Sequence, residues 1–136
     1  MVHVLTLLAC TEKPISSTWI AGSVNTNPVV IRQIVGHLRD AGLVRTLPGS
    51  AGGAALNRPP KEIALSEVYR LVKEETFFRL HPSEPNPHCP VGRNIQGVLI
   101  EICAEMDDLI ESALDQTSVA DILDQVREKE AHKESM

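Results

Sequence analysis

The sequence predicts a mainly α-helical fold with a small β-hairpin, in which a helical head is followed by one long helix. Two patterns support this prediction. Residues 16–58 follow the order helix, turn, helix and glycine-rich hairpin, and a heptad-like apolar pattern begins after Pro90. The composition agrees, because 43% of the residues are hydrophobic but only 3% are aromatic. The core is therefore expected to be aliphatic, which suits packed helices.

The first two helices are short. Val2–Cys10 is apolar enough to be the end of a first helix, with Cys10 in the core. Ser16 or Ser17 can cap a second helix that continues through Val24. This second helix is expected to place three residues inward: Trp19, Ile20 and Val24.

A third helix is predicted over residues 28–41 by signals at both ends. Asn27 is a good N-cap, Pro28 fits the first helical position, and Gly42 suits the left-handed residue after the end. Spacings of three and four place one apolar stripe inward: Ile31, Ile34, Val35 and Leu38. The other face carries side chains that can contact phosphates and base edges: Arg32, Gln33, His37 and Arg39.

A hairpin is expected next, with strands at Leu43–Leu47 and Ala54–Leu56 and a glycine-rich tip at residues 48–53. The tip is not a phosphate-binding loop of an enzyme, because it lacks the Gly-Lys-Ser/Thr ending. Two helices, a turn and this hairpin together predict a winged helix-turn-helix. Such a fold presents its second helix to the major groove of DNA.

After the hairpin, Ile63 and Leu65 are expected to form a brief strand or an entry segment before the next helix. Residues 66–75 are predicted to be helical, with Val68, Leu71 and Val72 inward. Four prolines then exclude regular structure from His81 to Pro90. Ser118 is expected to cap a last helix to about residue 128, followed by a frayed tail at residues 129–136.

A long helix is predicted from Val91 to about Gln116. One seam recurs along it at alternating steps of four and three: Ile95, Leu99, Ile102, Met106, Leu109 and Ala113. A monomer of this size has little left to cover such a seam, so we expect it to be a dimer interface with a second copy. Packing within its own chain is the alternative.

These elements divide the chain into four parts. We expect a winged helix-turn-helix domain at residues 1–75, a proline-rich sensor loop at 76–92, a dimerisation helix at 93–117, and a C-terminal helix and tail at 118–136.

The charge distribution favours a nucleic-acid partner for the first half. The net charge is -5, but residues 1–61 carry six basic and two acidic side chains, while the remainder carries seven and sixteen. Phosphate binding needs a locally basic face rather than a basic protein.

Several classes are not expected. No segment approaches the roughly 20 apolar residues of a membrane span, and Val2–Ala9 lacks the features of a signal peptide. Three widely spaced cysteines do not suggest disulfides, so a cytoplasmic location is expected. No paired carboxylates, nucleophile–base spacing or cofactor loop suggests an enzyme, and His81, His88 and Cys89 lack a convincing fourth metal ligand.

Five segments in this order resemble one bacterial family. They are residues 26–32, 38–44, the Gly52-Gly53 pair, residues 58–63 and Cys89-Pro90-Val91-Gly92. The chain resembles the Rrf-type winged-helix transcription regulators of the IscR, NsrR and CymR kind from about Val2 to Leu123. The resemblance implies a homodimer with crossing long helices, a pseudo-palindromic double-stranded DNA site, and regulation through cysteines in the loop before the long helix.

The chain departs from this family pattern in two places. Cluster-binding members hold an iron–sulfur cluster with three cysteines in or near that loop, whereas this chain has only Cys89 there and Cys103 lies inside the helix. We therefore expect no cluster and no other cofactor. The wing tip lacks the family's arginine, so Arg45 or Arg58 is expected to contact phosphates instead.

The residues expected to contact DNA lie on the third helix and the hairpin. Arg32 and Gln33 are expected to read guanine and adenine, and Val29 to meet a thymine methyl. The full set of expected DNA contacts is Thr26, Asn27, Pro28, Val29, Arg32, Gln33, Arg39, Arg45, Gly52 and Gly53.

Cys89 is the candidate sensor. Its position at the start of the long helix, beside His88, favours a thiolate, as a redox or electrophile sensor requires. An inert cysteine is the alternative, and Cys103 is expected to be inert, on the dimer seam or the core face. The sequence thus predicts a homodimeric DNA-binding repressor. The alternatives are a winged-helix protein-interaction module or a regulator controlled by a small molecule or metabolic partner.

Overall fold

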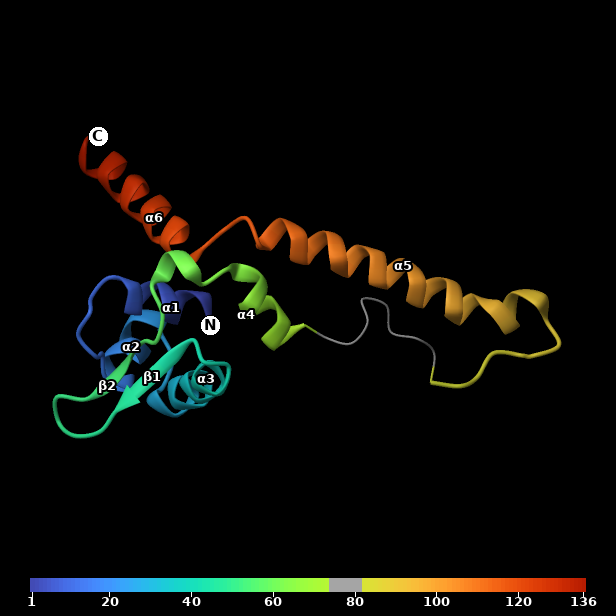
Figure 1. The fold of residues 1–136 in the computed structure, drawn as a ribbon, viewed down its shortest axis with the longest axis horizontal. Coiled ribbons are helices and arrows are strands. Elements are labelled where there is room, and N and C mark those ends of the chain that lie inside the picture. The colour runs from blue at the N-terminus through green and yellow to red at the C-terminus, as the bar shows by residue number, and fades with distance from the viewer. Residues whose placement is uncertain (74–81) are drawn as a thin grey trace.

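The computed structural model of the protein describes residues 1–73 and 82–136. Figure 1 shows a head from which one long helix extends as an arm. The elements run in the order α1 (Val2–Ala9), α2 (Ser17–Val24), α3 (Pro28–Asp40), β1 (Val44–Leu47), β2 (Gly53–Leu56), a 3-10 turn (Pro60–Glu62), α4 (Leu65–Val72), α5 (Pro90–Leu114) and α6 (Val119–Glu134). The prediction of a mainly α-helical winged helix-turn-helix with a long helix is confirmed.

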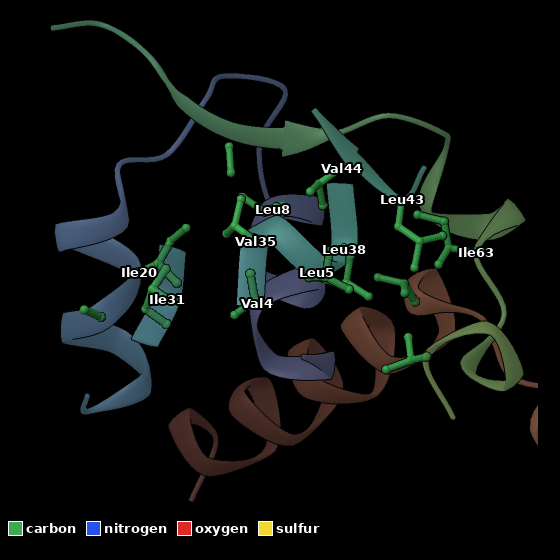
Figure 2. Packing of buried hydrophobic residues seen from close by; sticks show 14 residues of the cluster. Val4, Leu5, Leu8, Ile20, Ile31, Val35, Leu38, Leu43, Val44 and Ile63 are labelled. Atoms are coloured by element: carbon green, nitrogen blue, oxygen red, sulfur yellow. The ribbon is translucent and has the colours of Figure 1, made fainter. Parts of the chain in front are cut away.

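The head is organised around an aliphatic core. Three residues of α3 form its centre, with Ile31 and Leu38 fully buried and Val35 nearly so (Figure 2). They pack with Val4, Leu5 and Leu8 of α1, Ile20 of α2, Leu43 and Val44 of the hairpin, and Ile63. The predicted stripe of α3 is therefore the buried face, with Ile34 at its edge.

The predicted signals at the helix ends are confirmed. Asn27 Oδ1 accepts a hydrogen bond of 3.0 Å from Val30 N, and Ser16 Oγ accepts one of 3.2 Å from Trp19 N. Pro28 occupies the first turn of α3. Gly42 follows α3 with φ +76, a conformation that glycine adopts without strain.

The C-terminal segment returns to the head. Leu65 N donates to Thr117 O and Val119 N donates to Ile63 O, both at 2.9 Å, so residues 63–65 pair with residues 117–119. The expected strand at Ile63 and Leu65 is thus a single bridge, between Ala64 and Ser118. From there α6 packs against α1, with Val119 fully buried.

Several predictions about these elements are wrong. Trp19 is 58% exposed rather than inward, because Ile20 and Ala21 occupy the buried side of α2. Cys10 is exposed at the end of α1, where its thiol donates to Thr6 O. In α4, Leu71 and Val72 are exposed, because only the Ser66 and Val68 side is buried.

The predicted ends of three helices also differ. α4 ends at Val72, and the predicted end at Glu75 lies outside the described residues. α5 begins at Pro90 and ends at Leu114, within two residues of the predicted ends at Val91 and Gln116. α6 continues to Glu134, so the tail is not frayed from residue 129; glutamate and lysine favour helix, and Lys133 pairs with Glu130 along it.

The buried face of α3 predicts a large effect of truncation. Leu38→Ala should lower the free energy of unfolding by about 2–5 kcal/mol, because it leaves a cavity in the core. Val29→Ala, on the exposed side of the same helix, should change it by less than about 1 kcal/mol. Urea denaturation at a fixed protein concentration measures both. Equal losses would contradict the orientation of α3.

Candidate nucleic-acid interface

The helix-turn-helix consists of α2 and α3, which pack against each other. Between them, Asn25 adopts the left-handed conformation with φ 62, and Thr26 N donates to Ala21 O at 2.9 Å. This turn lets the chain reverse within three residues. The core then holds α3 with its buried stripe inward, so its opposite face points to solvent.

The exposed face of α3 carries most of the predicted contact residues. Val29 is 57% exposed, and Arg32, Gln33, His37 and Arg39 are exposed as well. Thr26 and Asn27 lie in the turn before this helix, also exposed, and Pro28 begins it. The structure therefore brings seven of the predicted residues together: Thr26, Asn27, Pro28, Val29, Arg32, Gln33 and Arg39.

The antiparallel β1–β2 hairpin, called the wing below, pairs Val44 with Leu56 and Leu47 with Gly53. Its second strand is anchored on the other side, because Ile15 and Ala54 exchange two hydrogen bonds of 2.9 Å. Arg45 is exposed on β1. The wing is therefore fixed between α3 and the segment that follows α1.

The close packing of backbone atoms in the wing explains why Gly52 and Gly53 lack a side chain. A Cβ at Gly52 would lie 2.1 Å from Leu47 O, and one at Gly53 would lie 2.2 Å from Ile15 O. Gly53 also has φ +145. Their predicted contacts with DNA stay a prediction, whereas the close backbone approaches account for the glycines themselves.

Arg58 and Arg39, both expected to contact DNA, form ion pairs within the chain. Arg58 Nη2 lies 2.6 Å from Glu67 Oε1, so its guanidinium is paired with α4. Arg39 Nη2 lies 3.3 Å from Asp40 Oδ1 in an exposed pair, which contributes little to stability. Arg39 can exchange this partner for a phosphate more easily than Arg58 can exchange Glu67.

Sequence reasoning missed the position of Trp19. Its exposed indole lines a hollow of about 470 Å³ beside the wing tip, together with Pro14, Ser50 and Gly52. The apolar character of tryptophan favoured an inward position, and no sequence signal opposed it.

Cys89 is the N-cap residue of α5 and is exposed, as predicted. The loop before it turns back on the helix, because Cys89 N donates to Asn86 O at 3.2 Å. Gly92 permits this contact, since a Cβ there would lie 2.6 Å from Asn86 O. In Figure 1, this end of α5 is the one farther from the head.

The arm exposes the predicted seam in this single chain. Ile95, Ile102 and Leu109 are 37%, 43% and 71% exposed, Ala113 is exposed, and Leu99 and Met106 are partly buried. Cys103 lies one turn after Leu99 and is buried in the single chain, which agrees with a position on the core face. The exposed aliphatic side chains are available for a partner.

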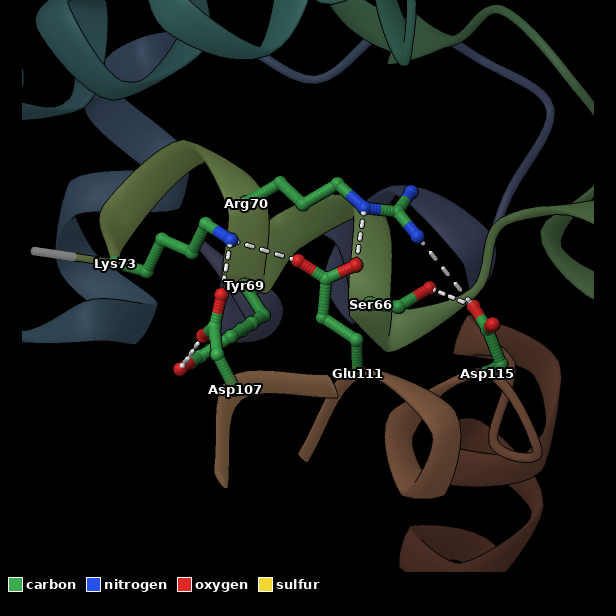
Figure 3. Close-up of polar contacts among 7 residues, drawn as sticks. All are labelled: Ser66, Tyr69, Arg70, Lys73, Asp107, Glu111 and Asp115. Carbon is green, nitrogen blue, oxygen red and sulfur yellow. Dashed lines mark hydrogen bonds and ion pairs between the residues drawn. The ribbon is translucent and has the colours of Figure 1, made fainter. Parts of the chain in front are cut away.

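A polar cluster, called the α4–α5 ladder below, joins the arm to the head (Figure 3). Tyr69 Oη donates to Asp107 Oδ1 at 2.8 Å, and Lys73 Nζ contacts both Asp107 and Glu111, the latter at 2.8 Å. Arg70 Nε donates to Glu111 Oε2 at 2.9 Å, and Ser66 Oγ donates to Asp115. Sequence reasoning missed this cluster, although its three carboxylates recur every four residues on α5.

The ladder shifts the pKa values of its members. Hydrogen bonds from Lys73, and then from Tyr69, hold the pKa of Asp107 below its ordinary 3.8. Hydrogen bonds from Lys73, and then from Arg70, lower the pKa of Glu111 from 4.5. The hydrogen bond to Asp107 raises the pKa of Tyr69, and hydrogen bonds to both carboxylates raise the pKa of Lys73.

The family model Rrf2, described as iron-dependent transcriptional regulator, matches residues 1–125 of this chain. The chain belongs to the Rrf2 family. YwnA of Bacillus subtilis (strain 168) is 42% identical over 123 residues, which cover 90% of each protein. The HTH-type transcriptional regulator CymR of the same organism is 27% identical over 113 residues, covering 82% of this chain and 73% of CymR.

Solved structures agree with this assignment. The structure of CymR, the global cysteine regulator of B. subtilis, superposes with a TM-score of 0.64 at 25% identity, covering 91% of this chain and 90% of CymR. That of T. potens IscR gives 0.66 at 25% identity, covering 94% and 83%. This Rrf2 protein is thus a DNA-binding transcriptional regulator and not an enzyme.

The cysteines of this Rrf2 protein do not fit an iron–sulfur cluster within one chain. Cys89 and Cys103 are fourteen residues apart, and both belong to α5 or its N-cap, which separates them by roughly 21 Å along the helix axis. Cys10 follows the last residue of α1, in the head. Among residues 1–73 and 82–136, no three potential ligands cluster to hold a metal ion. His81 lies outside these residues.

None of the helices in the described part of the chain is long and apolar enough to cross a membrane.

The ladder predicts a dependence of stability on pH. Because Asp107 and Glu111 have lowered pKa values, their contribution is fully present above pH 4.5 and is lost as the pH falls below 3.8. Lys73→Met should therefore reduce the loss of stability between pH 7 and about pH 3. Urea denaturation at both pH values measures this loss. The exposed Lys61→Met is the control, and identical losses in wild type and Lys73→Met would contradict the role of the ladder.

Proposed function

We propose that this regulator is a homodimeric repressor of the cytoplasm that binds a pseudo-palindromic site. The observation that carries the proposal is α3, whose buried stripe leaves a polar face exposed beside the wing. This arrangement suits a helix that enters the major groove, while the wing contacts the adjacent backbone. Thr26 and Asn27 precede this helix, and Gly52 and Gly53 belong to the wing, so their predicted contacts with DNA are part of the proposal. Arg45 is also on the wing but lines a separate hollow with Cys10 and Arg58, and its predicted contact with DNA is part of the proposal too.

The exposed seam of α5 supports a dimer. Ile95, Ile102 and Leu109 form one stripe on a helix with little cover from its own head. A second copy of α5 supplies an identical stripe, and heptad spacing lets two such helices interlock. A two-fold dimer presents two α3 helices, so its DNA site should have matching half-sites.

Cys89 is proposed as the sensor. Its thiol is exposed at the N-terminus of α5, where a dissolved oxidant can reach it. Hydrogen peroxide would oxidise this thiol to a sulfenic acid: one peroxide oxygen is transferred to the sulfur, and the other leaves as water. A second Cys89 thiol could then displace a second water to form an intersubunit disulfide.

The signal would reach the head through α5. Cys89 lies at one end of this helix, and the α4–α5 ladder binds its other half to α4. A change in the crossing of two α5 helices would therefore turn the two heads relative to each other and alter the spacing of the α3 helices.

The dimer is tested with Leu109→Lys. A charge in the apolar seam should dissociate the dimer, because the lysine would be buried without a partner. Sedimentation equilibrium should give the monomer mass. Val29→Lys, which alters a similarly exposed residue of α3, should stay dimeric. A Leu109→Lys protein that remains as dimeric as Val29→Lys would overturn the proposed interface.

The sensor is tested with Cys89→Ser in a DNA-binding titration with and without hydrogen peroxide. The reduced variant should bind a duplex from the protein's own promoter region as wild type does, but peroxide should no longer release it. Cys10→Ser removes the other exposed thiol and should still respond. Release of Cys89→Ser by peroxide at the wild-type concentration would exclude this cysteine as the sensor.

A further inference from the structure

A groove of about 330 Å³ separates α3 from the wing. From α3 it is lined by Arg32, Val35, Gly36 and Arg39, and from β1 by Thr46 and Leu47. Ser17 at the start of α2 lies at its edge. The groove therefore combines two guanidinium groups and two hydroxyl groups around an apolar floor.

Positions on α3 divide into two outward rows. Arg32, Gly36 and Arg39 follow at spacings of four and three, so they share the side of the helix that faces the wing. Val29, Gln33 and His37 follow at spacings of four and form the neighbouring row, which is outside the groove and exposed to solvent. The two rows thus face different surroundings.

Gly36 is unexplained by the packing of the head. It lies in the interior of a 13-residue helix, where glycine is unfavourable compared with alanine. A Cβ built at Gly36 meets nothing within 4 Å, and the backbone needs no positive φ there. In contrast to Gly52 and Gly53, its missing side chain leaves space that the protein itself does not fill.

We infer that this groove holds the sugar-phosphate backbone of one DNA strand, and that sequence is read by the neighbouring row. This inference rests on the proposed DNA-binding face. Arg32 and Arg39 are roughly 10 Å apart along the axis and flank Gly36, which lets the strand approach the helix closely. Guanidinium groups bind phosphates in a bidentate manner, and Thr46 and Ser17 offer hydroxyl donors.

The charges around the groove agree with a phosphate. Arg32 is exposed on α3, and within the described residues Arg39 pairs with the exposed Asp40 carboxylate. The assignment changes the expected role of Arg32, which the sequence suggested as a reader of guanine. Val29, Gln33 and His37 become the residues that meet the base edges, with Gln33 suited to adenine.

The two roles are separated by fluorescence anisotropy with a labelled promoter duplex and a scrambled duplex at several salt concentrations. Arg32→Ala and Arg39→Ala should weaken binding to both duplexes by the same factor, on the order of tenfold, and lower the salt slope by about 1 each. Gln33→Ala should keep the salt slope and reduce the preference for the promoter duplex roughly tenfold.

The proposal that a DNA strand occupies the space at Gly36 is tested with Gly36→Gln, because a side chain there would project into the groove. It should lose affinity for both duplexes while remaining folded by circular dichroism and at least as resistant to heat. Gly22→Gln is the matched control, since Gly22 also lies in a helix with nothing within 4 Å but does not line the groove. Its affinity should be that of wild type.

Two results would overturn the inference while leaving the proposed function intact. One is wild-type affinity of Gly36→Gln. The other is an Arg32→Ala protein that loses only its preference for the promoter duplex, which would make Arg32 a base reader. If the wild-type protein itself binds neither duplex with a dependence on salt, the DNA-binding proposal fails first and the groove assignment fails with it.

Discussion

The burial of one stripe of α3 is the constraint on which the rest of the structure depends. Ile31, Val35 and Leu38 can leave water only by packing on α1 and α2, and this packing fixes the rotation of the helix about its axis. Once the rotation is fixed, Gln33 points outward and Arg32 faces the wing. The chemistry of the DNA-facing surface is therefore a consequence of aliphatic packing on the other side of the same helix.

The α4–α5 ladder is the second constraint, and it differs in kind. Its members are partly exposed, so each ion pair alone contributes little. Together these contacts orient the two helices. Lys73 bridges two carboxylates one helical turn apart, and Tyr69 donates a hydrogen bond to one of them. A network of this kind holds α4 and α5 in register, as the proposed transmission of a signal from the arm to the head requires.

The sequence was sufficient where local chemistry decides the structure. The Asn27 cap, Pro28 and Gly42 define α3 because each satisfies a need of the helix end itself. The sequence was insufficient where a neighbouring element determines whether a side chain is buried. Periodicity places Leu71 and Trp19 on a face but does not say whether another element covers it. The roles proposed for Arg32 and Gly36 likewise required the position of the wing, because adjacent residues of one helix can face different partners.

The central claim is that α3 and the wing read DNA, and one titration of the reduced wild-type protein tests it most directly. Fluorescence anisotropy would compare a labelled duplex from its own promoter region with a scrambled duplex over a range of salt concentrations. The account predicts tighter binding to the promoter duplex, with an affinity that falls steeply as salt rises. Equal and weak binding to both duplexes, unchanged by salt, would contradict it and would favour a winged helix that binds protein instead.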